Sequence, residues 1–102
     1  MKDSTKVMRS VMEDLKARLF NCERKNQLSC YDRDEEITRK IQSIGDTISF
    51  FERQKESMER LVTTTTHKAY IKRITSWIQK LEDLRSKCIS ELNDRRAAQG
   101  GD

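Results

Sequence analysis

Residues 37–62 have the sequence ITRKIQSIGDTISFFERQKESMERLV and contain the clearest structural pattern in the chain. Their apolar residues alternate between steps of four and three, which places them along one side of a helix. The pattern lasts four heptads and is interrupted only by the polar residue Lys55. It predicts a long amphipathic helix over residues 34–62. The apolar stripe consists of Ile37, Ile41, Ile44, Ile48, Phe51, Met58 and Val62.

A pattern of the same kind lies on each side of this segment. The N-terminal pattern predicts a helix over about residues 5–27, with a stripe at Met8, Met12, Leu15, Leu19 and Cys22. The C-terminal pattern predicts a helix over about residues 66–94, with a wider stripe at Tyr70, Ile71, Ile74, Trp77, Ile78, Leu81, Leu84, Cys88 and Leu92. Asp32 followed by Glu35 resembles a capping box that opens the middle helix. The threonines at 63–66 connect that helix to the third.

The composition favours one all-α domain. The chain has 102 residues, of which 37% are charged and 34% are hydrophobic, and it contains no proline. Long helices that each bury one stripe suit this balance better than a sheet, which needs more turn residues. We therefore expect one domain over residues 1–96 and a flexible tail over residues 97–102. The fold is either an antiparallel up-down-up three-helix bundle or an elongated helical hairpin that oligomerises through coiled-coil-like seams.

The three stripes also predict which residues share a level in an up-down-up bundle. If the chain reverses near residues 31 and 64, four apolar layers form, as expected of a sequence that specifies one bundle. A dimeric hairpin has the same periodicity. The layers are Met12 with Phe51 and Trp77, Leu15 with Ile48 and Leu81, Leu19 with Ile44 and Leu84, and Cys22 with Ile41 and Cys88.

We find no catalytic, cofactor-binding or metal-binding motif in the sequence. The three cysteines, Cys22, Cys30 and Cys88, lack the paired spacing of zinc sites. The single histidine, His67, is about 30 Å from Cys88 along one predicted helix. We expect His67 to be a solvated histidine at the start of the third predicted helix, directly after the threonine connection. A redox switch between Cys22 and Cys88 is a further hypothesis, because the predicted layers place these two residues together.

The N-terminus and the cysteines predict a compartment. An odd number of cysteines, together with the lack of an apolar leader, favours free thiols in a reducing environment. No stretch approaches the roughly 20 apolar residues that span a bilayer. We therefore expect a cytoplasmic or otherwise intracellular protein without a membrane partner.

The segment between residues 60 and 80 departs most from charge balance, in a chain with a net charge of +4. It contains no acidic residue, and it includes a predicted helix N-terminus, which favours anions. One hypothesis is that this face contacts an anion or a nucleic acid. The other is that Tyr70 and Trp77 belong to the core and the basic residues are merely solvated. The candidate contacts are Arg60, Lys68, Lys72, Arg73 and Lys80.

Three functions remain open at this point. The first is a non-enzymatic helical protein–protein interaction module, which acts as an adaptor, inhibitor or assembly factor on a protein partner or as a homo-oligomer. Its candidate partner contacts are Phe20, Phe50 and Ile89, which are apolar residues outside the stripes. The second is a nucleic-acid-binding accessory protein that uses the basic face of residues 60–80. The third is a small all-helical dimeric enzyme.

Overall fold

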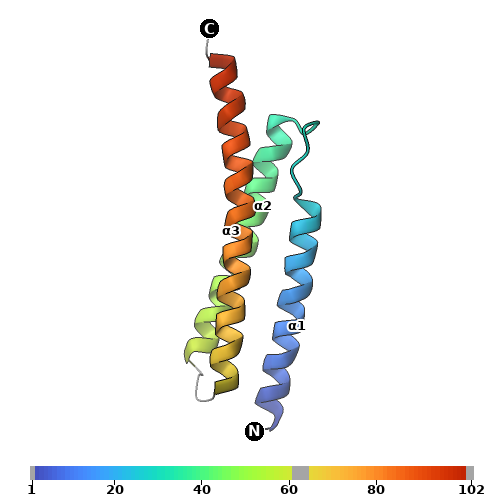
Figure 1. The fold of residues 1–102 in the computed structure, drawn as a ribbon. Coiled ribbons are helices and arrows are strands. Elements are labelled where there is room, and N and C mark those ends of the chain that lie inside the picture. Colours follow the sequence, from blue (N-terminus) through green and yellow to red (C-terminus); the bar gives the residue numbers. More distant parts are fainter. Residues whose placement is uncertain (1, 61–64, 101–102) are drawn as a thin grey trace.

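The described part of the chain forms three helices that run up, down and up along one long axis, each antiparallel to the helix before it (Figure 1). The computed structural model describes residues 2–60 and 65–100, with side chains for residues 6–60 and 65–99. Helix α1 spans Lys2–Lys25, α2 spans Asp34–Arg60 and α3 spans Thr65–Gly100. Within these ranges the structure contains no strand, which confirms the predicted all-α class.

Helices α2 and α3 form the closely packed part of the fold, and α1 lies against them less tightly. The ring centroids of Phe51 and Trp77 are 6.5 Å apart in an edge-to-face arrangement, as their predicted layer requires. Near the start of α2, the Arg95 Nη1 atom of α3 lies 3.4 Å from the Asp34 carboxylate. Because both contacts fit one antiparallel register, the predicted alignment of these two helices is correct.

The buried face of α3 is rotated relative to the predicted stripe. Ile74, Leu81 and Cys88 are fully buried, whereas Tyr70 and Trp77 are only half-buried. His67 is 7% exposed, so our expectation of a solvated histidine is wrong. It lies seven residues before Ile74 and therefore on the same inward side of the helix. The predicted stripe begins at Tyr70 and therefore leaves out this first buried position.

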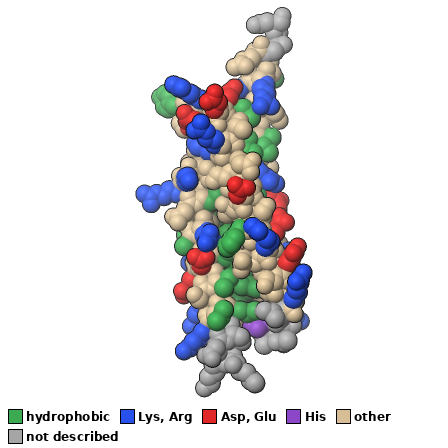
Figure 2. Space-filling model, turned by 180° about the vertical axis from the view of Figure 1, so that it is seen from behind, with side chains coloured by type: hydrophobic (Ala, Val, Ile, Leu, Met, Phe, Trp, Pro, Cys, Tyr) green, Lys and Arg blue, Asp and Glu red, His purple; other side chains and the backbone are tan. Residues whose placement is uncertain are grey.

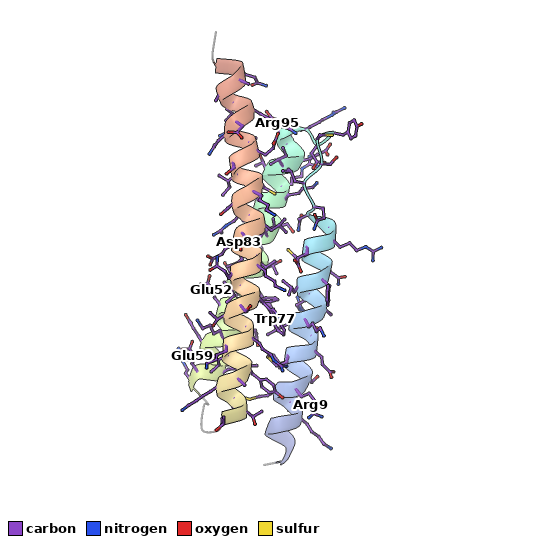
Figure 3. All side chains as sticks on the ribbon, viewed as in Figure 1. Arg9, Glu52, Glu59, Trp77, Asp83 and Arg95 are labelled. Atoms are coloured by element: carbon purple, nitrogen blue, oxygen red, sulfur yellow. The ribbon has the colours of Figure 1, made fainter. Side chains whose placement is uncertain are left out.

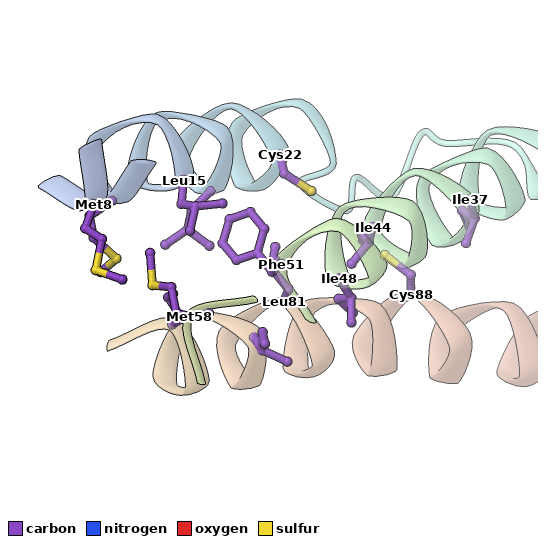
Figure 4. Packing of buried hydrophobic residues seen from close by; sticks show 14 of the residues in the cluster. Met8, Leu15, Cys22, Ile37, Ile44, Ile48, Phe51, Met58, Leu81 and Cys88 are labelled. Carbon is purple, nitrogen blue, oxygen red and sulfur yellow. The ribbon is translucent and has the colours of Figure 1, made fainter. Parts of the chain in front are cut away.

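The position of α1 along the bundle also differs from the predicted layers. The Arg18 guanidinium lies 4.4 Å from the centroid of the Phe50 ring, and the Asn26 Nδ2 atom donates to the Ser43 hydroxyl at 3.4 Å. These two contacts show that α1 lies about 8 Å further from the first connection, residues 26–33, than the predicted layers require, at 1.5 Å per residue. Cys22 and Cys88 therefore lie at different levels of the core, which removes the basis for a redox switch between them (Figure 4).

The first connection explains this displacement, because residues 26–33 do not form a tight reversal. The Asp32 carboxylate accepts hydrogen bonds from the Ser29 backbone N–H at 2.9 Å and from the Lys40 ammonium. Asp32 therefore does not open α2 as a capping box, and that prediction is wrong. The first backbone bond of α2 runs from the Ile37 N–H to the Arg33 carbonyl. The extra length of this connection separates the end of α1 from the start of α2.

Helix α3 continues to Gly100, beyond the predicted end near residue 94 (Figure 1). Arg95 stabilises this extension, because its Nε atom lies 2.6 Å from the Glu91 carboxylate one turn earlier. Its Nη1 atom also donates to the Asp32 carbonyl in the first connection. The residues over which we expected a flexible tail are therefore helical as far as the structure describes them.

The surface between the helices is mixed in character. Seen from behind, hydrophobic side chains gather in a narrow strip along the lower half, with charged side chains of both signs on either side (Figure 2). No helix in the described part of the chain has the length and apolar character needed to cross a bilayer.

Candidate functional site: a basic groove between α1 and α3

The predicted basic residues do not form one face. Lys68 and Lys72 lie beside Glu59 and Ile71, on the side of α3 that adjoins α2. Arg73 lies on the side of α3 that adjoins α1, because consecutive helical residues point about 100° apart. Lys80 follows on that second side, and Arg60 is exposed in the last turn of α2. The basic face of residues 60–80 that we expected is thus divided between two surfaces.

Arg73 instead joins two basic residues of α1. An open groove of about 800 Å³ lies between α1 and α3 and is lined by Arg9, Met12, Glu13, Lys16, Tyr70, Arg73 and Trp77. The α1 residues at positions 9, 13 and 16 are spaced four and three apart, so they form one row along the helix. The labelled side chains show the arrangement, with Trp77 between α3 and α1 and Arg9 on α1 (Figure 3). We call this site the basic groove.

Half-buried aromatic rings form the floor of the basic groove. The Trp77 ring packs edge-on against Phe51, and Phe51 packs edge-on against Phe50 at a centroid distance of 6.5 Å. The Arg18 guanidinium covers Phe50 on the side of the bundle between α1 and α2, which is a cation–π contact. This chain of rings fixes the Trp77 side chain from behind. Trp77 therefore presents a fixed apolar surface to a ligand in the basic groove.

The cations of the basic groove have no partner among the described residues. The ion pairs of the structure engage Arg18, Lys40 and Arg95, and none of them includes Arg9, Lys16 or Arg73. All three are exposed. Among the residues whose side chains the structure describes, Glu13 is the only carboxylate that lines the groove, so the charge of this lining is positive. Such a surface attracts an acidic group by charge and holds an apolar one by contact with the rings.

A second groove, between α2 and α3, has the opposite charge. It is lined by Glu52, Lys55, Glu56, Glu59, Thr75, Ile78, Gln79 and Glu82, so four carboxylates face one lysine. Glu52 and Glu59 lie on the side of α3 away from α1 (Figure 3). Lys55, which interrupts the predicted stripe of the middle helix, is thus half-buried among glutamates. We call this second site the acidic groove.

The three candidate partner contacts are not on one surface. Phe20 is 60% exposed and lies one helical turn after Lys16, so it extends the edge of the basic groove. Phe50 is half-buried beneath Arg18, between α1 and α2. Ile89 is 40% exposed on α3. Tyr31, in the first connection, is 90% exposed and was not among the predicted contacts.

The cysteines are free thiols, with Cys22 and Cys88 buried and Cys30 exposed. Burial raises the pKa of the Cys88 thiol above its ordinary value of 9.0, which keeps it protonated and weakly nucleophilic. Among the described residues, no group of three histidine, cysteine or carboxylate side chains is placed to hold a metal ion.

Comparisons with protein families, curated proteins and solved structures found no match to this chain. The basic groove was not predicted as a unit, because Arg9 and Lys16 lie more than fifty positions before Arg73. The available signal was a pair of basic residues seven apart, next to the apolar stripe of the first helix.

Proposed function

We propose that this chain is a non-enzymatic helical protein–protein interaction module, in the class of adaptors, inhibitors and assembly factors. In this proposal the basic groove binds an acidic segment of a partner protein. The observation that supports it most is the combination of three unpaired cations, Arg9, Lys16 and Arg73, above a floor of Tyr70 and Trp77. Tryptophan, tyrosine and arginine are the residues that most often dominate binding energy at protein interfaces.

An amphipathic helix with acidic flanks fits the shape and charge of this groove. The groove lies between two helices, and such grooves commonly receive the apolar face of a third helix. Contact with Trp77 and Tyr70 supplies affinity, and Phe20 adds exposed apolar surface at one edge. The cations select a partner with carboxylates beside its apolar stripe.

Binding to nucleic acid is the alternative, and the division of the basic residues makes it less favourable. Lys68 and Lys72 lie on a different side of α3 from Arg73 and Lys80, so a phosphate backbone cannot follow all of them along one surface. Proteins that bind nucleic acid commonly neutralise about 6–10 phosphates. Three cations of the described residues line the basic groove, and Glu13 offsets one of them.

Fluorescence of Trp77, the only tryptophan in the chain, provides a direct test. The probe is a synthetic amphipathic peptide with leucine on one face and glutamate on the other. We expect its addition at low salt to change the Trp77 emission saturably. The same peptide with lysine in place of glutamate should leave the emission unchanged, because its charges repel the groove cations. A response to oligothymidine but not to the acidic peptide would favour the nucleic-acid alternative.

Charge reversal in the basic groove tests whether the acidic peptide binds there. The double variant Arg9→Glu and Arg73→Glu should weaken binding of the acidic peptide at least tenfold, because two attractions become repulsions. The matched control is Arg24→Glu with Arg39→Glu, which changes the net charge equally at exposed positions outside both grooves. Equal weakening in the two variants would reject the groove as the binding site.

A further inference from the structure

We propose that the acidic partner of the basic groove is a second copy of this chain, which presents α2 from its own acidic groove. This inference rests on the proposed function and names the partner of the same site. It depends on a match between two rows of charges on the two helices. Each row is exposed or half-exposed and lies outside the ion pairs of the described residues.

The first row lies on α1, along one wall of the basic groove. Arg9, Glu13 and Lys16 have the charge order plus, minus, plus, with steps of four and then three residues. The second row lies on α2, along one wall of the acidic groove. Glu59, Lys55 and Glu52, taken in that order, have the charges minus, plus, minus, also with steps of four and then three.

These two rows match when the helices lie antiparallel. Arg9 then faces Glu59, Glu13 faces Lys55 and Lys16 faces Glu52, so each charge meets its opposite. Each row extends about 10 Å at 1.5 Å per residue. The polar interruption at Lys55 has a role in this arrangement, because it meets the only carboxylate in the opposing row.

The fold places the two rows at the same level along its long axis. The contact of Arg18 with Phe50 and the contact of Asn26 with Ser43 fix the alignment of α1 with α2. When this alignment is extended along α1 and α2, Lys16 lies at the same height along the bundle axis as Glu52, and Arg9 at the same height as Glu59. A neighbouring copy in the same orientation therefore presents its antiparallel α2 row to the α1 row with little displacement along the axis.

The grooves around the two rows are complementary as well. Arg73 adds a cation to the first groove, and Glu56 and Glu82 add carboxylates to the second. Because the two surfaces are different, one contact leaves a free basic groove on one copy and a free acidic groove on the other. Such head-to-tail contacts form rings or open chains rather than closed dimers.

Sedimentation at two salt concentrations tests this association. At about 20 mM salt, concentrated protein should have a weight-average mass at least twice the 12.1 kDa of one chain. At about 500 mM salt it should return to the mass of one chain, because exposed charges are then screened. A constant mass of one chain at low salt would overturn the inference.

Inverted rows make the test specific to these residues. One variant inverts the α1 row, with Arg9→Glu, Glu13→Lys and Lys16→Glu. The other inverts the α2 row, with Glu52→Lys, Lys55→Glu and Glu59→Lys. Each alone should remain a monomer, because like charges then face each other between identical copies. Their equal mixture should associate again, and so should one chain with both rows inverted, whose net charge equals that of the original chain.

The outcomes separate this inference from the proposed function. Circular dichroism establishes that each variant is helical, and a folded chain with both rows inverted that stays monomeric would overturn the inference. Self-association of a variant with only one inverted row would also overturn the inference. Binding of the acidic peptide without self-association keeps the interaction module and rejects the second copy as its partner. The peptide titration is made at protein concentrations well below those at which the chains associate.

Discussion

Asp32 connects the loop between α1 and α2 to the rest of the bundle. Its carboxylate accepts hydrogen bonds from Lys40 and from the Ser29 backbone, and its carbonyl accepts one from Arg95. The Lys40 ammonium also donates to the Gln27 carbonyl at 2.7 Å. Hydrogen bonds from Lys40 and from the Ser29 N–H hold the pKa of Asp32 below its ordinary value of 3.8.

Acid should therefore weaken the fold partly through Asp32. Because its pKa is lower in the folded chain, the Asp32 carboxylate stabilises the fold above pH 3.8, and this stabilisation is lost as the pH falls through the lowered pKa. We expect Asp32→Asn to have a lower melting temperature than the original chain at about pH 6, and the difference to shrink towards about pH 2. Thermal unfolding followed by circular dichroism measures this. A difference that is independent of pH would show that the charge of Asp32 is not the cause.

Gly45 lies in the middle of α2, where glycine costs stability. A Cβ atom placed there would meet only the Arg85 Nη1 atom at 3.6 Å, which is an ordinary contact with the end of a flexible side chain. We expect Gly45→Ala to raise the free energy of unfolding by about 0.5–1 kcal/mol, because alanine loses less backbone entropy in a helix. Urea unfolding measures the change. The control Ala69→Gly, at an exposed position of α3, should lower stability by a similar amount.

Helix α1 packs less extensively against its neighbours than α2 and α3 pack against each other. α2 and α3 pack closely along their shared length. α1 is attached through one stripe of buried side chains, among them Leu15, which faces Phe51 (Figure 4). We therefore expect α1 to open locally before the other two helices separate.

Two matched substitutions test this difference between helices. Leu15 and Leu81 are both fully buried, and each change to alanine should cost about 2–5 kcal/mol because it leaves a cavity. Leu15→Ala should accelerate amide hydrogen exchange mainly in α1, whereas Leu81→Ala should accelerate it in all three helices. Mass spectrometry of peptide fragments locates the exchange. The same exchange pattern in both variants would mean that the three helices unfold as one unit.

The three helices together form a rod. The Cα radius of gyration is 17.0 Å and the extents are 64 × 19 × 15 Å. A compact domain of about 100 residues has a radius of gyration of about 13 Å. The long helices and the low hydrophobic content explain the difference, because each helix buries only one stripe.

Small-angle X-ray scattering tests this shape. At about 500 mM salt, where we expect single chains, the radius of gyration should be close to 17 Å. A value near 13 Å would mean that the helices fold back more tightly than the structure has them. A mass of two chains at this salt concentration would favour the dimeric hairpin, in which the apolar stripes of two copies cover each other.

The periodicity of the sequence determined the three helices and most of their buried residues. Alternating steps of four and three define one side of a helix without any knowledge of its neighbours, so Ile37, Ile44 and Leu81 were predictable. Polar contacts that depend on the neighbouring chain were not predictable in the same way. The end of α3 is an example, because Arg95 pairs with Asp34, sixty-one positions earlier.

The distance of α1 along the bundle, and therefore which charges meet, depends on how the three helices pack together. Helical periodicity repeats every turn, so a helix moved by one turn keeps the same apolar side, and the length of residues 26–33 selects among these positions. That selection brings Arg9 and Lys16 beside Arg73. The basic groove is a property of packing between helices, which spacing within a single helix does not contain.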